Sequence, residues 1–339
     1  MGASVRCLQN AEAWAKKTFC YREHKPGMPC QSVDGVFPNL LDFGGTRIGM
    51  VSAGIGAKAE IAERTGNYRT LGWDLAAIVV DELVAKGFES TNIAHMLDVD
   101  RLDYNSIDDL MHGLHDAAKK IGVAIYGGKI AELGSRISGY GDGMHLSWGA
   151  TAIGILYANL EHPIDGDDIR PGDIIISLKS LGFQGNGFSL VRKIMIESLG
   201  DAWHTVRYDD LSTWGETLLT PSRLFAPVIG HLLDAGIRLK GIAYVTNGLE
   251  SPLQRVLNVN GVGARLTNLF EPPQVMKKII ELGHIPLEIA YTEWNMGNGM
   301  LVIVDKTAIG PALLHLNKSG SEAVAAGEVT DEPGIKIHY

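Results

Sequence analysis

The stretch Leu181-Gly-Phe-Gln-Gly-Asn-Gly-Phe-Ser-Leu-Val-Arg-Lys-Ile194 decides the fold, because it joins a strand pattern to a helix pattern. A strand-like run at 173–178 precedes it, and a helix-like run continues from it to Leu199. Glycines just before a helix start let the backbone turn tightly and approach a ligand, and here there are three: Gly182, Gly185 and Gly187. The first N–H groups of a helix have no internal partner, so this junction could bind a phosphate or a carboxylate. The same pattern also fits an ordinary turn before a capped helix.

Composition and charge are those of an ordinary globular chain. The 339 residues are 45% hydrophobic and 20% charged, and this length is enough for two domains with large cores. The net charge of −9 and the lack of any Lys/Arg block predict that nucleic acid is not a partner. No run of about 20 apolar residues occurs, which predicts no membrane span. Three cysteines without CxxC spacing (Cys7, Cys20 and Cys30) predict reduced thiols and a cytoplasmic location.

Strand and helix patterns are mixed in both halves, which predicts a two-domain α+β (mixed α/β) fold rather than a doubly wound sheet. Helices are predicted over 71–86, 106–120, 221–235, 272–282 and 307–317, in addition to the helix that follows the glycine loop and continues to Leu199. Strands are predicted over 46–52, 92–97, 123–126, 150–159, 173–178, 298–304, 323–329 and 335–338. Ser106, with Asp109 three residues later, predicts a capping box at the start of the second helix.

A segment rich in acidic residues and proline, 161–171, predicts the boundary between the domains. We therefore expect an irregular N-terminal segment at 1–44, an N-terminal domain at 45–162 and a C-terminal α/β domain at 163–339.

A second glycine-rich turn, Gly54-Ile-Gly-Ala-Lys58, follows the first predicted strand of the N-terminal domain. A lysine at the end of such a turn could reach a phosphate, and it could equally be a solvated side chain. The two turns together predict binding of a phosphorylated small molecule.

Five motifs along the chain resemble segments of one enzyme family. The clearest is Gly185-Asn-Gly-Phe-Ser-Leu-Val-Arg-Lys-Ile194, which is similar to that family's Ser-Asn-Gly-Tyr-Ser-Leu-Val-Arg-Lys. The other four are Leu71-Gly-Trp-Asp-Leu75, Gly127-Gly-Lys-Ile-Ala-Glu132, Leu218-Leu-Thr-Pro-Ser-Arg223 and Asn295-Met-Gly-Asn-Gly-Met300. The family is the aminoimidazole ribonucleotide synthetases, also called phosphoribosylformylglycinamidine cyclo-ligases, and the resemblance extends from about Gly45 to the C-terminus.

The resemblance implies an N-terminal α+β domain that dimerises by joining sheets, giving a homodimer, and a C-terminal α/β domain. It also implies an ATP-dependent ligase of purine biosynthesis. Such an enzyme activates the amide oxygen of formylglycinamidine ribonucleotide as a phosphate ester with Mg-ATP, and a nitrogen then displaces the phosphate to close the imidazole ring. Because kinases share this superfamily, the fold alone does not fix the acceptor.

The sequence departs from the family at acidic positions that resemble magnesium ligands. The family's Thr-Asp-Gly-Val-Gly-Thr-Lys reads Ser52-Ala-Gly-Ile-Gly-Ala-Lys58, so Ala53 replaces an aspartate. The family's Leu-Asp-Tyr aligns with Ala94-His95-Met96, which puts His95 in place of its aspartate, unless the nearby Asp98 shifts the alignment by a few residues. Lys129 replaces the glutamate of Gly-Gly-Glu. Magnesium prefers several carboxylate oxygens, so a Mg²⁺ site here would have fewer protein ligands than in the family. Lys129 could serve as a point charge for phosphates.

The resemblance and the residue types together predict four sets of site residues. The predicted catalytic residues are Lys58, His95 and Lys129; the ATP-binding residues Gly54, Gly56, Lys58, Asp74 and Glu82; the metal ligands Asp74 and Glu82; and the substrate-binding residues Gly185, Asn186, Gly187, Ser189, Thr246 and Asn247. Neighbouring helical residues point about 100° apart, so we expect Glu82 to face the site and Asp81 to be solvated.

Alternative interpretations stay open at this level. Loss of the acidic residues also fits a divergent member that has lost Mg-ATP chemistry and binds a phosphorylated metabolite. The same scaffold could also act on another acceptor.

Overall fold

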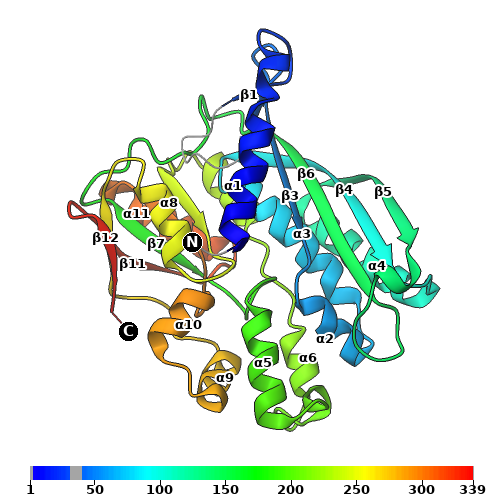
Figure 1. Ribbon diagram of the computed structural model, residues 1–339. Coiled ribbons are helices and arrows are strands. Elements are labelled where there is room, and N and C mark those ends of the chain that lie inside the picture. The colour runs from blue at the N-terminus through cyan, green and yellow to red at the C-terminus, as the bar shows by residue number, and fades with distance from the viewer. Residues whose placement is uncertain (1–2, 31–39, 339) are drawn as a thin grey trace.

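The computed structural model describes residues 3–30 and 40–338 of the protein. In these residues the strands form two six-stranded sheets, one from each half of the chain. Figure 1 shows the two sheets on either side of the helix α3. Across the described ranges, no helix has both the length and the apolar character that a bilayer-spanning segment needs.

The first sheet has the order β1-β2-β3-β6-β4-β5, and its pairs are antiparallel except for β4 with β5. Its strands are β1 (Met28–Cys30), β2 (Leu40–Asp42), β3 (Arg47–Gly54), β4 (Phe88–Val99), β5 (Ala124–Glu132) and β6 (Leu146–Leu156). The helices α3 (Arg69–Val84) and α4 (Tyr104–Ile121) pack on one face. Gly72 and Gly113 let these two helices touch, because a Cβ on either would clash with backbone of the other. The opposite face keeps apolar side chains in contact with water.

The second sheet has the order β12-β9-β11-β7-β10-β8 and is antiparallel except for β12 with β9. Its strands are β7 (Ile174–Lys179), β8 (Gly241–Tyr244), β9 (Gly263–Leu266), β10 (Asn298–Val304), β11 (Ala323–Thr330) and β12 (Gly334–Ile337). The helices of this half are α5 (Phe188–Leu199), α6 (Trp214–Leu218), α7 (Ala226–Asp234), α8 (Glu250–Leu257), α9 (Gln274–Gly283), α10 (Leu287–Glu293) and α11 (Ile309–Lys318). One apolar core runs through both halves, since α3 also packs against α7.

The predicted two-domain α+β architecture is confirmed, and most predicted elements occur within a few residues of their expected bounds. The start of α4 is a correction: the N-cap is Asp103, whose side chain accepts from the Ser106 N–H at 2.8 Å, so Ser106 lies inside the helix. The helix expected from Pro221 begins only at Ala226, because the preceding residues extend along α3.

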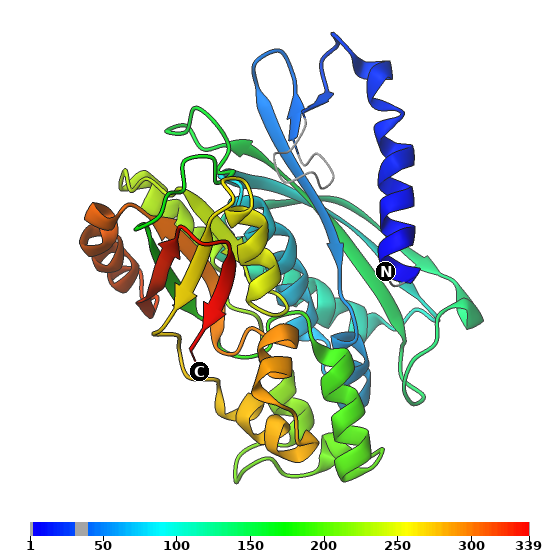
Figure 2. The same cartoon turned by 60° about the vertical axis from the view of Figure 1, so that its left-hand side comes forward.

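The prediction that 1–44 is irregular is wrong for the described part of that segment. It contains α1 (Ala3–Lys16), a 3-10 turn at Phe19–Arg22 and the strands β1 and β2. Figure 2 shows α1 standing apart from the strands of the first sheet, and none of its described side chains is buried. A helix without an apolar contact face leaves no clear period in the sequence, so the sequence pattern does not predict it.

Candidate active site

The glycine-rich loop from β7 to α5 packs tightly against other parts of the protein. A Cβ at Gly185 would lie 2.5 Å from the Cδ1 atom of Ile78 on α3. Gly187 has a φ of +83°, and a Cβ there would lie 2.7 Å from the Trp294 ring. These two glycines therefore permit close contact with protein side chains, which is a different use from the ligand contact that the sequence suggested.

Contacts with two other segments, at 294–295 and at Arg223, fix the course of this loop. Asn295 donates to the Gly182 carbonyl at 2.9 Å, and the Trp294 indole donates to the Gly187 carbonyl at 3.1 Å. Gln184 and Arg223 form a reciprocal pair: the Gln184 amide donates to the Arg223 carbonyl at 3.2 Å and accepts from the Arg223 N–H at 2.9 Å. Gln184 keeps a φ of 58°, which is uncommon for a residue with a side chain, so the pair holds a strained backbone in place.

The start of α5 retains the features of an anion site. Its N-cap is Gly187, and among the described residues no side chain caps its first N–H groups. Asn186 is half-buried at the turn and Ser189 is exposed in the first turn. Free N–H groups and the positive end of the helix dipole favour a phosphate here.

The second glycine turn leads from β3 into α2 (Lys58–Thr65), which the sequence patterns did not predict. Gly54 and Gly56 are exposed at the turn. Lys58 is fully buried, so in this arrangement its ammonium group does not line an open surface.

Lys58 and Asp74 are brought together, as an ion pair enclosed between the two halves. The Lys58 Nζ atom lies 2.6 Å from Asp74 Oδ2 and donates to the Thr220 carbonyl at 2.8 Å. The other carboxylate oxygen of Asp74 accepts from the N–H of Ser222 at 2.7 Å and from its hydroxyl at 2.6 Å. Burial raises the pKa of Asp74, against the opposing effects of Lys58 and Ser222. The roles predicted for Lys58 and Asp74 in ligand or metal binding stay predictions, and they require this pair to open.

The two glycine turns lie close to each other. Lys58 Nζ is 5.5 Å from the centre of the Phe188 ring at the start of α5. Glu60, in the first turn of α2, forms an ion pair with Arg192 of α5. The structure thus places side by side the starts of two helices that belong to different halves of the chain.

The positions where the sequence departs from the family also meet, in one row across the first sheet. Ala53, Ala150, His95 and Gly128 are consecutive partners on β3, β6, β4 and β5. Lys129 follows Gly128, pairs with Met96 and is exposed.

His95 sits in a restricted setting within this row. The Trp148 indole donates to His95 Nδ1 at 3.3 Å, and a Cβ at Gly128 would lie 2.5 Å from His95 Nε2. Burial lowers the pKa of His95, which favours the neutral imidazole. Its Nδ1 accepts from the indole, so the neutral ring carries its proton on Nε2.

Asp81 and Glu82 are arranged in the opposite way to the expectation. Asp81 is fully buried, whereas Glu82 is half-buried. Asp81 accepts from the Phe225 N–H at 2.9 Å and from the Ala226 N–H at 2.7 Å. The signal that could have identified it is its seven-residue spacing from Asp74, which puts both carboxylates on one face of α3.

Thr246 and Asn247 lie at a bend after β8, with Asn247 exposed. A Cβ at the next residue, Gly248, would lie 2.1 Å from the Thr292 carbonyl, so this bend packs on the end of α10. Gly187 packs against Trp294, which lies two residues after Thr292. The predicted substrate residues of both segments therefore gather around the same end of α10.

The residues present do not fit a magnesium site held by protein carboxylates. The row across the first sheet offers Ala53, His95 and Gly128 with Lys129 beside it, and none of these supplies an acidic oxygen. Over the ranges that the structure describes, no group of three or more His, Cys, Asp or Glu side chains could hold a metal ion. Magnesium binding by Glu82 and by the enclosed Asp74 stays a prediction.

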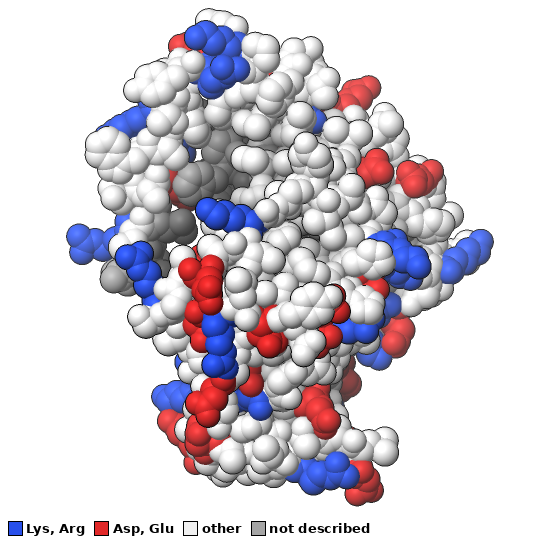
Figure 3. Space-filling model, turned by 90° about the vertical axis from the view of Figure 1, so that its right-hand side faces the viewer, with Lys and Arg blue, Asp and Glu red and all other residues white. Residues whose placement is uncertain are grey.

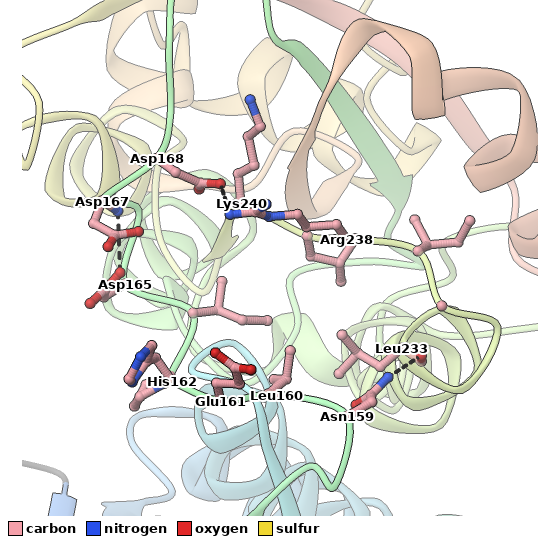
Figure 4. A pocket seen from close by; sticks show the side chains of 15 residues that line it. Asn159, Leu160, Glu161, His162, Asp165, Asp167, Asp168, Leu233, Arg238 and Lys240 are labelled. Atoms are coloured by element: carbon pink, nitrogen blue, oxygen red, sulfur yellow. Dashed lines mark hydrogen bonds and ion pairs between the residues drawn. The ribbon is translucent and has the colours of Figure 1, made fainter.

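A separate cavity of about 500 Å³ lies where the segment between the halves meets the end of α7, and Figure 4 shows it. Two of its charged side chains, Arg238 and Asp168, form an ion pair at 2.5 Å. None of the predicted site residues lines it.

Comparison with known proteins agrees with this geometry. The solved structure of thiamine-monophosphate kinase from Stenotrophomonas maltophilia K279a has a similar fold, with a TM-score of 0.65, 15% identity and coverage of 88% of this chain and 87% of that one. A HypE–HypF complex structure matches with a TM-score of 0.63, 16% identity and 96% coverage of both chains. Both likenesses concern the fold, which defines a class of two-domain α+β proteins with one sheet in each half.

Relatives in sequence identify the family, which the similar folds alone do not. Residues 39–156 match the N-terminal domain of AIR synthase related proteins and residues 170–339 match the C-terminal domain. A phosphoribosylformylglycinamidine cyclo-ligase of Thermococcus gammatolerans is 33% identical over 335 residues, covering 98% of this chain and 94% of that protein. One from Thermococcus kodakarensis is 31% identical, covering 98% and 93%. The chain belongs to the AIR synthase related protein family, which confirms the resemblance.

Proposed function

We propose that this protein is an ATP-dependent phosphoribosylformylglycinamidine cyclo-ligase, which converts formylglycinamidine ribonucleotide to aminoimidazole ribonucleotide. The observation that carries the proposal is the 33% identity to a curated cyclo-ligase over 98% of this chain and 94% of that protein. The adjacent starts of α2 and α5 support it, since the reaction needs two phosphate-bearing molecules in one place. The related fold of AaThiL was solved in complex with AMPPCP and TMP, which is in line with a nucleotide beside a phosphorylated partner.

The substrate phosphate is assigned to the start of α5. Free N–H groups there, with Asn186 and Ser189, can donate to phosphate oxygens, and the bend that carries Thr246 and Asn247 lies near the same end of α10. The exposed turn at Gly54 and Gly56 is assigned to the nucleotide.

The charged and titratable residues are assigned to the phosphoryl transfer. Lys129 is exposed and can balance phosphate charge as a point cation. Neutral His95 carries a proton on Nε2 and can pass it only to a group that approaches past Gly128. Lys58 contributes once its pair with Asp74 opens. No step is assigned to protein-held magnesium, because the carboxylates that would hold it do not converge.

The protein is further assigned to the cytoplasm and to a homodimer. Apolar side chains on the open face of the first sheet support the dimer, since Met50, Met96, Ile153 and Ile155 are each at least 38% exposed. Figure 3, seen from the β5 side, shows a broad stretch of uncharged surface with charged groups at its margins. Contiguous exposed apolar surface of this kind is typical of a protein contact.

A coupled assay tests the activity. Purified protein with ATP and formylglycinamidine ribonucleotide should release ADP and form aminoimidazole ribonucleotide in equal amounts. Asn186→Ala should raise the KM for the ribonucleotide more than the KM for ATP. Binding of either ligand, seen as a rise in melting temperature, without ADP release would contradict a cyclo-ligase and favour a binding protein.

A further inference from the structure

The segment 220–226 is an irregular stretch whose backbone is held almost entirely by side chains from elsewhere. Lys58 donates to the Thr220 carbonyl at 2.8 Å, and the Trp73 indole donates to the Ser222 carbonyl at 2.7 Å. The N–H groups of Ser222, Phe225 and Ala226 all donate to aspartates of α3. In most irregular segments these groups bond to water or to nearby backbone, so this segment is docked on α3.

The spacing of the two aspartates matches the spacing of the groups that they hold. Asp74 and Asp81 are seven residues apart on α3, which is about 10.5 Å along a helix that rises about 1.5 Å per residue. Ser222 and Phe225 are three residues apart in a segment without regular secondary structure, and three residues of chain can span at most about 10 Å. One face of α3 thus holds both ends of the segment at once.

Asp81 also takes the place of a local helix cap. α7 begins at Ala226 and no side chain of its own first turn caps it. The carboxylate of Asp81, 145 residues earlier, accepts the Ala226 N–H at 2.7 Å and the Phe225 N–H at 2.9 Å. A capping carboxylate satisfies N–H groups that a helix leaves free, so α7 depends on the other half of the chain for its start.

The same segment is joined to the glycine loop ahead of α5. Arg223, in the middle of the segment, forms the reciprocal pair with Gln184. Gly182 faces Thr220, whose side chain lies 4.0 Å from a Cβ built on that glycine. The position of α3 is therefore transmitted through 220–226 to the loop that carries Asn186 and the start of α5.

We propose that Asp74 and Asp81 are positioning residues, a two-point clamp on segment 220–226 that sets where the α5 start lies relative to the α2 turn. This deepens the proposed function and rests on it for the identity of the ligands. The clamp itself is independent of them, because its contacts are all within the protein.

Hydrogen exchange on the full-length protein without ligands tests the clamp. In Asp81→Ala, amides of 222–226 should exchange roughly tenfold faster, the change expected when one buried hydrogen bond is lost. Amides of 182–190 should also exchange faster, because the glycine loop loses its support. Asp103→Ala is the matched control: it removes the cap of α4, within one half, and should speed exchange only near 104–107.

Two further variants keep the test decisive if Asp81→Ala does not fold. Asp81→Asn keeps the acceptor oxygen and should restore protection at 225–226. Gln184→Ala removes the pair with Arg223 that joins segment 220–226 to the glycine loop. Amides of 182–190 should then exchange faster, while those of 225–226 stay protected. Unchanged exchange at 182–190 in Gln184→Ala, or a uniform increase over the whole chain in Asp81→Ala, would overturn the proposal. Because no ligand is present, this result is separate from the outcome of the cyclo-ligase assay.

Discussion

Asp81 is a buried carboxyl group whose described partners are backbone N–H groups, with no cation in contact. Burial raises its pKa to about 8, against the lowering effect of its bonds to Phe225 and Ala226. Its charge also acts on Tyr244, because Asp81 is one of the carboxyl groups that raise the pKa of that buried phenol. In the folded protein, Asp81 therefore binds a proton at pH values where an unfolded chain has released it.

This shift predicts how stability depends on pH. A folded pKa above the ordinary value means that the folded state holds more protons, so Asp81 lowers stability as pH rises from about 4 towards 8. Asp81→Asn removes this effect. Relative to the unmodified protein, its free energy of unfolding should increase by up to about 1.4 kcal/mol per pH unit over that window. Urea denaturation at pH 5, 6.5 and 8 measures the difference, and a constant difference would contradict the assignment.

The Lys58–Asp74 pair gives a second prediction for single residues. Lys58→Met leaves a buried carboxylate without its cation and should lower the free energy of unfolding by about 3 to 5 kcal/mol. The double variant with Asp74→Asn keeps an acceptor for Ser222 and should recover most of that loss. Chemical denaturation of the single and double variants gives the coupling energy, and additive losses would show that the two side chains act separately.

At the scale of elements, the glycine loop and α3 are fitted to each other. Gly185→Ala would bring a methyl group within 2.5 Å of Ile78 and should cost about 1 to 3 kcal/mol through overpacking. Combining it with Ile78→Ala should relieve much of that cost. Gly310→Ala, on α11 with nothing within 4 Å, is the control and should be neutral or slightly stabilising. Melting temperatures of the four proteins decide the matter.

The elements also show what sequence reasoning can and cannot supply. α3 and α5 were predicted closely, because apolar residues at helical spacing or a glycine-rich start mark them. β10 was predicted with its exact bounds from its apolar run, and every residue of it is buried. The short strands β8 and β9 have only four residues each, too few for a periodic signal.

The segments that form the candidate site could be predicted from the sequence, but the contacts between their residues could not. The sequence pointed to Gly54–Lys58 and to the loop before α5, and these do converge. It could not show that Lys58 is enclosed by Asp74 and Thr220, since that contact joins residues 162 positions apart. Nor could it show that Gly185 serves packing, because a glycine beside a ligand and a glycine beside Ile78 look the same in sequence.

At the scale of the whole molecule, the open face of the first sheet predicts association. Ile153→Asp places a charge among exposed apolar side chains, next to Met50 on the neighbouring strand, and should convert a dimer to a monomer. Leu211→Asp is the control, because Leu211 is 92% exposed in the other half of the chain. Light scattering after size-exclusion chromatography measures both masses, and a dimeric Ile153→Asp would exclude this face as the contact.

The remote cap on α7 has a consequence for synthesis of the chain. A ribosome adds about 5 to 20 residues per second, so roughly 7 to 30 s separate the appearance of Asp81 from that of Ala226, 145 positions later. During this interval the face of α3 that later contacts segment 220–226 is exposed to water, and Asp74 and Asp81 carry their ordinary charge. We expect these charges to keep the half-made product from sticking to its neighbours, and Asp81→Leu to increase co-sedimentation of stalled nascent chains. Asp74 and Asp81, which are costly to bury in the folded protein, would then keep the incomplete chain from aggregating.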